Sequence, residues 1–148
     1  MKKLLFALAV MLFAGLASAA SAPSWTDRAR NAALEIVGRC DSRSSRWEGG
    51  GIYSYCETSV LRVLRGSAGP TLVVRQRGGE VDGIAQKVSH VAMIEPGQTY
   101  LLFLGRDDSG SWSPTSKGVN PVVETPDLGE TVDGQPLEEI IRELGSSN

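Results

Sequence analysis

The chain has 148 residues, a formal net charge of −2 and two cysteines. This length suits one domain with one modest core. Because the acidity is mild and unclustered, it argues against a surface for nucleic acid or anionic membranes. The frequent glycines and prolines, 17 and 7, favour many turns between short strands.

Residues 1–19, MKKLLFALAVMLFAGLASA, have the pattern of a secretory signal peptide. Two lysines precede an apolar core that is too short for a comfortable membrane span, and the run Ala17-Ser18-Ala19 forms a cleavage site of the A-x-A kind. No stop-transfer pattern follows, and no cysteine stands at the cleavage site. We therefore expect a periplasmic or secreted protein, cut after Ala19, without a membrane anchor.

The mature chain is expected to start with a polar arm over residues 20–32, with short helical character from Ser24. Trp25 in this arm either closes one end of the core, which we favour, or is an exposed binding aromatic. Alternation of apolar residues predicts a first strand over residues 33–40. The polar segment 41–51 with its three glycines then forms an extended hairpin or a loose tip. Trp47 is the best candidate there for an exposed aromatic, because loops carry function, although packing on the hairpin is the alternative.

The two cysteines, Cys40 and Cys56, favour a disulfide because an exported chain matures in an oxidising compartment. A hairpin tip centred on Glu48 would place them opposite each other, and Cys40 shares the parity of the inward-facing Leu34 and Ile36. A bridge that closes a loop of about 15 residues contributes roughly 3 kcal/mol. A redox pair or a metal site would need CxxC spacing or a third ligand, which the sequence lacks.

The segment Ile52–Gly66, IYSYCETSVLRVLRG, is the longest that reads as a strand. Its alternation places Cys56 on one face and the aromatic side chains of Tyr53 and Tyr55 on the other. The apolar phase slips near Leu61, which predicts a β-bulge or sharp bend. The alternative is a short helix over VLRVLRG.

Further strands are expected over residues 71–76 and 99–104, the latter a continuous apolar run typical of a buried strand. Weaker strand patterns cover residues 86–94, 111–116 and 119–124, and residues 81–84, 95–97 and 105–110 are expected to be turn-like. The Asp107-Asp108 pair lacks the spaced oxygens of a calcium loop. A linker over residues 125–135 precedes a helix over 136–144, whose apolar stripe is formed by Leu137, Ile140, Ile141 and Leu144.

These elements predict an all-β fold: a small OB-fold-like barrel of about five to six strands with one C-terminal helix. The expected organisation is a signal peptide (1–19), an arm (20–32), a barrel (33–124), and a linker with the helix (125–148). One histidine, His90, and no recognisable catalytic motif predict a protein that is not an enzyme and needs no cofactor or metal.

The order of three motifs, IYSY…VLRVLRG, TLVVRQRGGEVDGI and PGQTYLLFL, resembles a family of small exported bacterial proteins. The resemblance covers residues 33–119 and implies an OB-fold-like barrel of the netrin and tissue-metalloproteinase-inhibitor type. Cys40 and Cys56 depart from it, because they stand where apolar core residues are expected. The inhibitors chelate zinc through an N-terminal cysteine, which Ala20 cannot replace. The matching positions are Tyr53, Val60, Val63, Leu64, Gly66, Val74, Gln76, Gly78, Gly79, Gly83, Gly97, Tyr100 and Phe103.

Three functions follow as hypotheses. The first is a non-catalytic binding module that recognises a protein or glycan partner through an aromatic patch of Trp47, Tyr53 and Tyr55. The second is a protease inhibitor that acts through a loop or an edge strand, by analogy of fold alone. The third, which we consider least favoured, is an enzyme or metal protein centred on His90.

Overall fold

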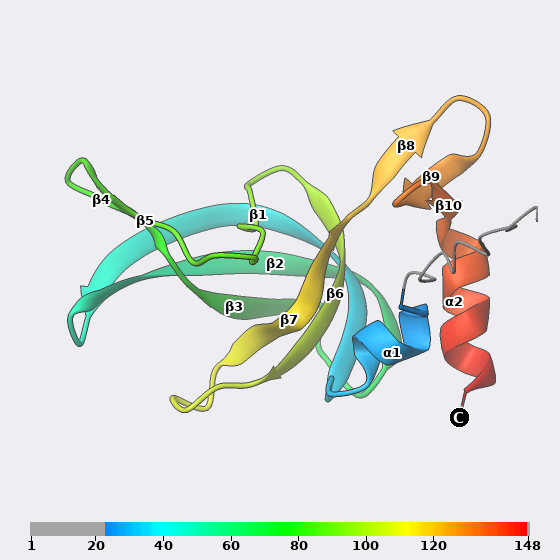
Figure 1. The fold of residues 1–148 in the computed structure, drawn as a ribbon, viewed down its shortest axis with the longest axis horizontal. Coiled ribbons are helices and arrows are strands. Elements are labelled where there is room, and N and C mark those ends of the chain that lie inside the picture. Colours follow the sequence, from blue (N-terminus) through cyan, green and yellow to red (C-terminus); the bar gives the residue numbers. More distant parts are fainter. Residues whose placement is uncertain (1–22, 148) are drawn as a thin grey trace, which may run out of the picture.

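The computed structural model describes residues 23–147, so the predicted signal peptide lies outside the described residues. The chain forms a closed five-stranded barrel with a short helix and a small sheet at one end (Figure 1). None of the helices in this part of the chain is long and apolar enough to cross a membrane. The elements are α1 (Trp25–Ala29), β1 (Leu34–Glu48), β2 (Gly51–Arg65), β3 (Thr71–Arg77), β4 (Gly79–Val81), β5 (Ile84–Gln86), β6 (Thr99–Arg106), β7 (Trp112–Pro121), β8 (Val123–Thr125), β9 (Gly129–Val132), β10 (Gln135–Pro136) and α2 (Leu137–Ser146).

The barrel strands follow the order β1-β2-β3-β7-β6, and β6 pairs with β1 to close the ring. All neighbours are antiparallel except β3 and β7, which meet in parallel at Val74 and Trp112. A five-stranded Greek-key barrel of this kind is the architecture of the OB-fold. The predicted fold class, an all-β small barrel with one C-terminal helix, is confirmed.

The long β1–β2 hairpin turns at Gly49 and Gly50, which have φ angles of 56° and 84°. Positive φ at both central residues is the requirement of a two-residue type I′ turn, and glycine meets it without strain. The segment predicted to be an extended hairpin or a loose tip is therefore an extended hairpin. Its strand β2 runs without interruption to Arg65, so the helical alternative over VLRVLRG is wrong. Leu61 has no partner in the register with β1, which confirms the predicted bulge.

The predicted disulfide joins Cys40 and Cys56, whose Cα atoms lie 5.9 Å apart. Both side chains are buried inside the barrel, as expected from their parity. The predicted register is wrong, however, because Cys40 pairs with Thr58 while Cys56 pairs with Arg43. The hairpin turns at Gly49-Gly50 and not at Glu48, which displaces the partner of Cys56 by three residues. The bulge between Cys40 and Ser42 then changes the register by one residue, so the two cysteines lie on a diagonal.

Strand β6 is buried on both faces, which explains its continuous apolar sequence. Leu102 and Leu104 point into the barrel with the disulfide, while Leu101 and Phe103 point outward into a second core. That second core is formed with α1, α2 and β9. Trp25 is 5% exposed and packs edge-on against Phe103, which confirms that it belongs to the core and is not an exposed aromatic.

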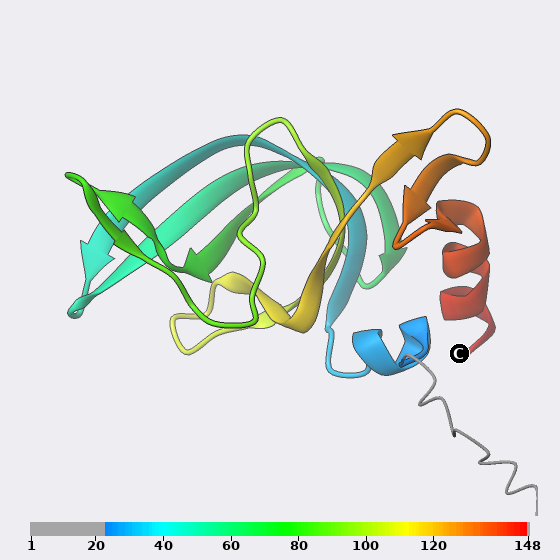
Figure 2. The same ribbon diagram turned by 45° about the horizontal axis from the view of Figure 1, so that its top comes forward.

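A loop over residues 87–98 crosses one opening of the barrel (Figure 2). Ile94 is buried in the barrel core. Its backbone N–H donates to Gln76 Oε1 at 3.0 Å, and Gln76 Nε2 donates to the Ala92 carbonyl at 2.6 Å. The strand pattern seen over residues 86–94 is therefore wrong. The Gln76 side chain satisfies backbone groups of this loop that a neighbouring strand would otherwise have to pair. The segment is therefore stable without a strand partner.

The end of the chain differs from expectation in two places. Strand β7 joins the strand predicted over 111–116 to the start of the one predicted over 119–124, whose end belongs to β8. The stretch expected to be a linker contains β9, which forms a three-stranded sheet with β8 and β10 at its two ends. The predicted helix is confirmed as α2 and buries Leu137, Ile140 and Leu144 on the outer core, although it ends at Ser146. Strands of two to four residues are too short to show alternation, which is why the sequence signalled only turns.

We predict that replacing both cysteines with alanine lowers the free energy of unfolding by about 3 kcal/mol, because the unfolded chain then regains loop entropy. Urea denaturation of the two forms measures the difference. A reductant should destabilise the parent chain and leave the Cys40→Ala/Cys56→Ala variant unchanged. Equal stability of the parent and the variant would contradict a stabilising role for the bridge.

We also predict that Phe103→Ala costs about 3–5 kcal/mol, because it empties the core between β6 and the helices. The control is Leu128→Ala, which removes a 54% exposed side chain and should change stability by less than about 0.5 kcal/mol. Thermal and urea unfolding of both variants provide the comparison. If the two variants are equally stable, the outer face of β6 is not a packed core.

Candidate functional site

The outer face of β2 and β3 lies between the ends of two hairpins. One is the β1–β2 turn at Gly49-Gly50, and the other is the β6–β7 turn over residues 107–111. Both hairpin ends project from the barrel on the side away from α1 and α2 (Figure 1). In OB-folds this face, together with the loops that flank it, is the surface that binds ligands. We call it the β2–β3 face.

The alternation of the strands decides which side chains form this face. The inward residues of β2 and β3 include Ser54 and Val74, both buried. On the outside, Tyr53 pairs across the strands with Arg77, and Tyr55 pairs with Arg75. Directly opposed residues share a face, so two tyrosines and two arginines stand together.

Arg75, whose side chain is only 14% exposed, connects the two hairpin ends through its guanidinium group. Its Nη2 donates to Glu48 Oε2 at 2.8 Å, and its Nη1 donates to Asp107 Oδ2 at 2.8 Å. Its Nε donates to Tyr55 Oη at 3.1 Å. Charge-assisted hydrogen bonds of this kind are stronger than neutral ones. Arg75 therefore holds the end of β1 and the β6–β7 turn in fixed positions over the face.

The tyrosine rings are half-buried because arginine side chains cover them. The Arg75 guanidinium carbon lies 3.7 Å from the centre of the Tyr53 ring, and that of Arg46 lies 4.1 Å from the centre of the Tyr55 ring. Arginine stacks readily on aromatic faces. The face is thus a layer of arginine over tyrosine and not a bare aromatic patch.

The ionisation of the two acids supports this network. Hydrogen bonds from Tyr55, Arg75 and Arg46 lower the pKa of Glu48 to about 2. Burial acts to raise the pKa of Asp107, but hydrogen bonds from Ser109, Arg75 and the Ser111 backbone outweigh it and lower that pKa to about 2. Both carboxylates are therefore charged at neutral pH, where each pairs with the Arg75 guanidinium.

A cleft of about 470 Å³ lies beside this network. Arg77 and Asp108 are exposed, and neither forms an ion pair with any residue between 23 and 147. Their charged groups are therefore available to a ligand, unlike those of Arg75 and Asp107. The cleft is lined by Tyr53, Arg75, Arg77, Asp107, Asp108, Ser109 and Ser113.

The structure brings together two of the three aromatic residues predicted to bind. Tyr53 and Tyr55 lie on the β2–β3 face, whereas Trp47 pairs with Ile52, whose side chain points to the opposite side. Trp47 is 45% exposed, as its place in a hairpin end suggested. The single patch of three aromatics is therefore divided between the two faces of the hairpin by strand alternation.

The charged residues of the site, Glu48, Arg75, Arg77 and Asp107, were not among the predicted binding residues. The two arginines have a signal in the sequence, since in TLVVRQR they take the parity opposite to Val74. Glu48 and Asp107 have none, because only the folded chain brings the two turns close together.

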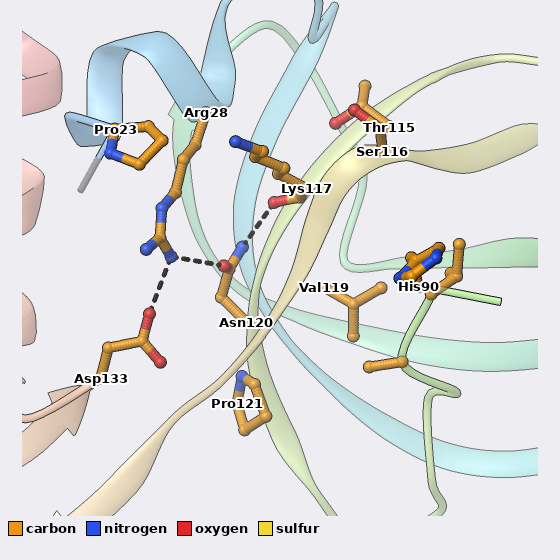
Figure 3. Close-up of a pocket in the computed structure, with 12 residues that line it drawn as sticks. Pro23, Arg28, His90, Thr115, Ser116, Lys117, Val119, Asn120, Pro121 and Asp133 are labelled. Carbon is orange, nitrogen blue, oxygen red and sulfur yellow. Dashed lines mark hydrogen bonds and ion pairs between the residues drawn. The ribbon is translucent and has the colours of Figure 1, made fainter. Parts of the chain in front are cut away.

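A second pocket, of about 330 Å³, lies where α1, β7, the 87–98 loop and the β9–β10 turn meet (Figure 3). Arg28 donates to Asp133 Oδ2 at 2.8 Å, and in the figure His90 lies on the far side of Val119 from this pair. Asp133 is the one acidic residue that lines the pocket, and within residues 23–147 it pairs with Arg28 and not with His90. Residues 23–147 contain no cluster of three His, Cys, Asp or Glu side chains that could hold a metal ion.

Comparisons of the chain with protein-family models, with curated proteins and with solved structures gave no match.

We predict that Arg75→Met raises the pKa values of Glu48 and Asp107 from about 2 toward their ordinary values, because the shared cation is lost. A depressed folded-state pKa stabilises the fold above the ordinary pKa, and this stabilisation is lost as the pH falls toward 2. The parent chain should thus lose more stability on acidification from about pH 4.5 than the variant.

The test is an NMR titration of the side-chain carboxyl carbons of Glu48 and Asp107. Urea unfolding at about pH 4.5 and at about pH 2 measures the change in stability. Arg142→Met, at an exposed arginine of α2, is the control and should leave both pKa values in place. Unchanged carboxyl titrations in Arg75→Met would contradict the network.

Proposed function

We propose that this chain is an exported, non-catalytic binding module that recognises a protein or glycan partner through the β2–β3 face. The observation that carries the proposal is the Arg75 network, which holds two hairpin ends beside a cleft. An arginine that pairs with an acid from each of two turns pre-organises the surface between them. Pre-organised surfaces bind with a smaller loss of conformational entropy.

The charges of Arg77 and Asp108 support the same proposal. They border the cleft but take no part in the ion pairs of residues 23–147, so they are not needed to hold the barrel together. Exposed charged groups beside a rigid cleft give orientation and specificity to a ligand. The structural residues of the face, Arg75 and Glu48, thus differ from the residues that meet the partner.

The features that predict export also support the proposal. The N-terminal sequence has the pattern of a signal peptide, and a Cys40–Cys56 disulfide is typical of oxidising compartments outside the cytosol. A small disulfide-bonded barrel with one histidine suits recognition better than acid–base or metal chemistry. The resemblance to the netrin and tissue-metalloproteinase-inhibitor type of barrel agrees with a role in binding.

We predict that the oxidised mature chain retains a specific partner from an envelope or secreted fraction, and that Tyr53→Ser and Arg77→Ala reduce the amount retained at least about fivefold. The reason is that both side chains line the cleft. Affinity capture followed by mass spectrometry, for proteins and for released sugars, measures the retained material. Circular dichroism and the intact disulfide confirm that each variant is folded.

Two controls make this experiment selective. Arg142→Ala removes an exposed arginine at the opposite end of the barrel and should retain the partner fully. Trp47→Ala tests the other face of the hairpin. Retention that is lost only in Trp47→Ala, or that is equal in all variants, would exclude the β2–β3 face. A protease as the captured partner would favour inhibition as the purpose of binding.

A further inference from the structure

The geometry of the cleft points to its ligand: we propose that the β2–β3 face binds a neutral oligosaccharide. This inference rests on the proposed function, since it names the class of partner for the same surface. Three properties of the cleft indicate this ligand: the chemistry of its lining, its charge balance and its extent.

The lining of the cleft is polar throughout. Apart from the Tyr53 ring, every side chain that lines it carries a charge or a hydroxyl group, and none is aliphatic. Protein–protein interfaces are enriched in tyrosine and arginine but depleted in aspartate and serine, and the cleft is lined by two aspartates and two serines. The Arg77 guanidinium and the Asp108 carboxylate, which line the same cleft, suit the hydroxyl groups of a sugar, which both donate and accept hydrogen bonds.

The charge balance of the cleft favours a neutral ligand over an anionic one. A second hollow, of about 410 Å³, adjoins the first at their shared residue Arg77 and is also bordered by Lys87. Within the first cleft, the positive charges of Arg75 and Arg77 are matched by the negative charges of Asp107 and Asp108. A cleft whose own charges cancel gives little electrostatic attraction to a nucleic acid or an acidic polysaccharide.

The two hollows on either side of Arg77 also indicate the size of the ligand. The first lies toward the β6–β7 turn, and the second lies toward Gly50 and the end of β5, at Gln86. A ligand that occupied both would cross Arg77. This arrangement suits a chain of several sugar units better than a single sugar, and it places the exposed Arg77 guanidinium at the middle of the site.

The test is affinity electrophoresis of the oxidised mature chain in native gels. The gels contain a neutral polymer (a β-glucan, a mannan, a xylan or a dextran), an acidic polymer (polygalacturonate) or single-stranded DNA. We expect retardation by at least one neutral polymer and by neither acidic one. Between 50 and 200 mM salt, the affinity should change by less than about twofold, because no counterions are released.

Three variants test whether the cleft residues contribute to binding. Arg77→Ala and Asp108→Ala should each weaken retardation by about tenfold, because each removes charged hydrogen bonds to sugar hydroxyls. Arg142→Ala should have no effect. Asp108→Ala distinguishes a neutral ligand from an acidic one. Removal of this negative charge would strengthen the binding of an acidic ligand, whereas it should weaken the binding of a neutral one.

Several results would overturn the inference: no retardation by any neutral polymer, equal retardation of the parent chain and Arg77→Ala, or tighter binding by Asp108→Ala. If the affinity capture described above retains a protein through Tyr53 and Arg77 while no polymer is bound, the neutral oligosaccharide is excluded and the binding module stands. If neither experiment shows dependence on the β2–β3 face, both proposals fail.

Discussion

Burial of β6 on both of its faces is the constraint on which the rest of the structure depends. Its inward side chains fill the barrel together with the disulfide, while Leu101 and Phe103 require a cover on the outside. Trp25 of α1 and the apolar side of α2 supply that cover. Both helices lie at this end of the barrel, while the β1–β2, β4–β5 and β6–β7 hairpins lie at the opposite end (Figure 1).

At the end of the barrel away from the helices, the ion pairs of Arg75 hold the β1–β2 and β6–β7 hairpins in place. At the helix end, apolar packing has this role. Hairpin ends carry few apolar contacts and are expected to be mobile, yet Glu48 and Asp107 each hold the same guanidinium at 2.8 Å. The low pKa values of both acids keep these contacts charged throughout the neutral range. A rigid surface between two turns is thus obtained without apolar burial, which leaves its exposed charges free for a ligand.

Much of the fold was accessible from the sequence because its main signals are local. Alternation in Ile52–Gly66 gave the inward Cys56 and the outward Tyr53, and the apolar run at 99–104 gave the buried strand. The bulge beside Cys40 was not accessible, because it depends on the pairing of two strands. The same limit applies to the site: the two tyrosines followed from parity, but the meeting of Glu48, Arg75 and Asp107 depends on closure of the barrel.

The measurement that tests the central claim most directly is hydroxyl-radical footprinting of the oxidised mature chain, with and without an envelope extract of the producing organism. If the β2–β3 face is the binding surface, oxidation of Tyr53 and Tyr55 decreases in the extract, while Leu128 at the opposite end of the barrel reacts as before. Protection confined to residues 123–146, with both tyrosines unchanged, would contradict the account and assign binding to the C-terminal sheet and helix.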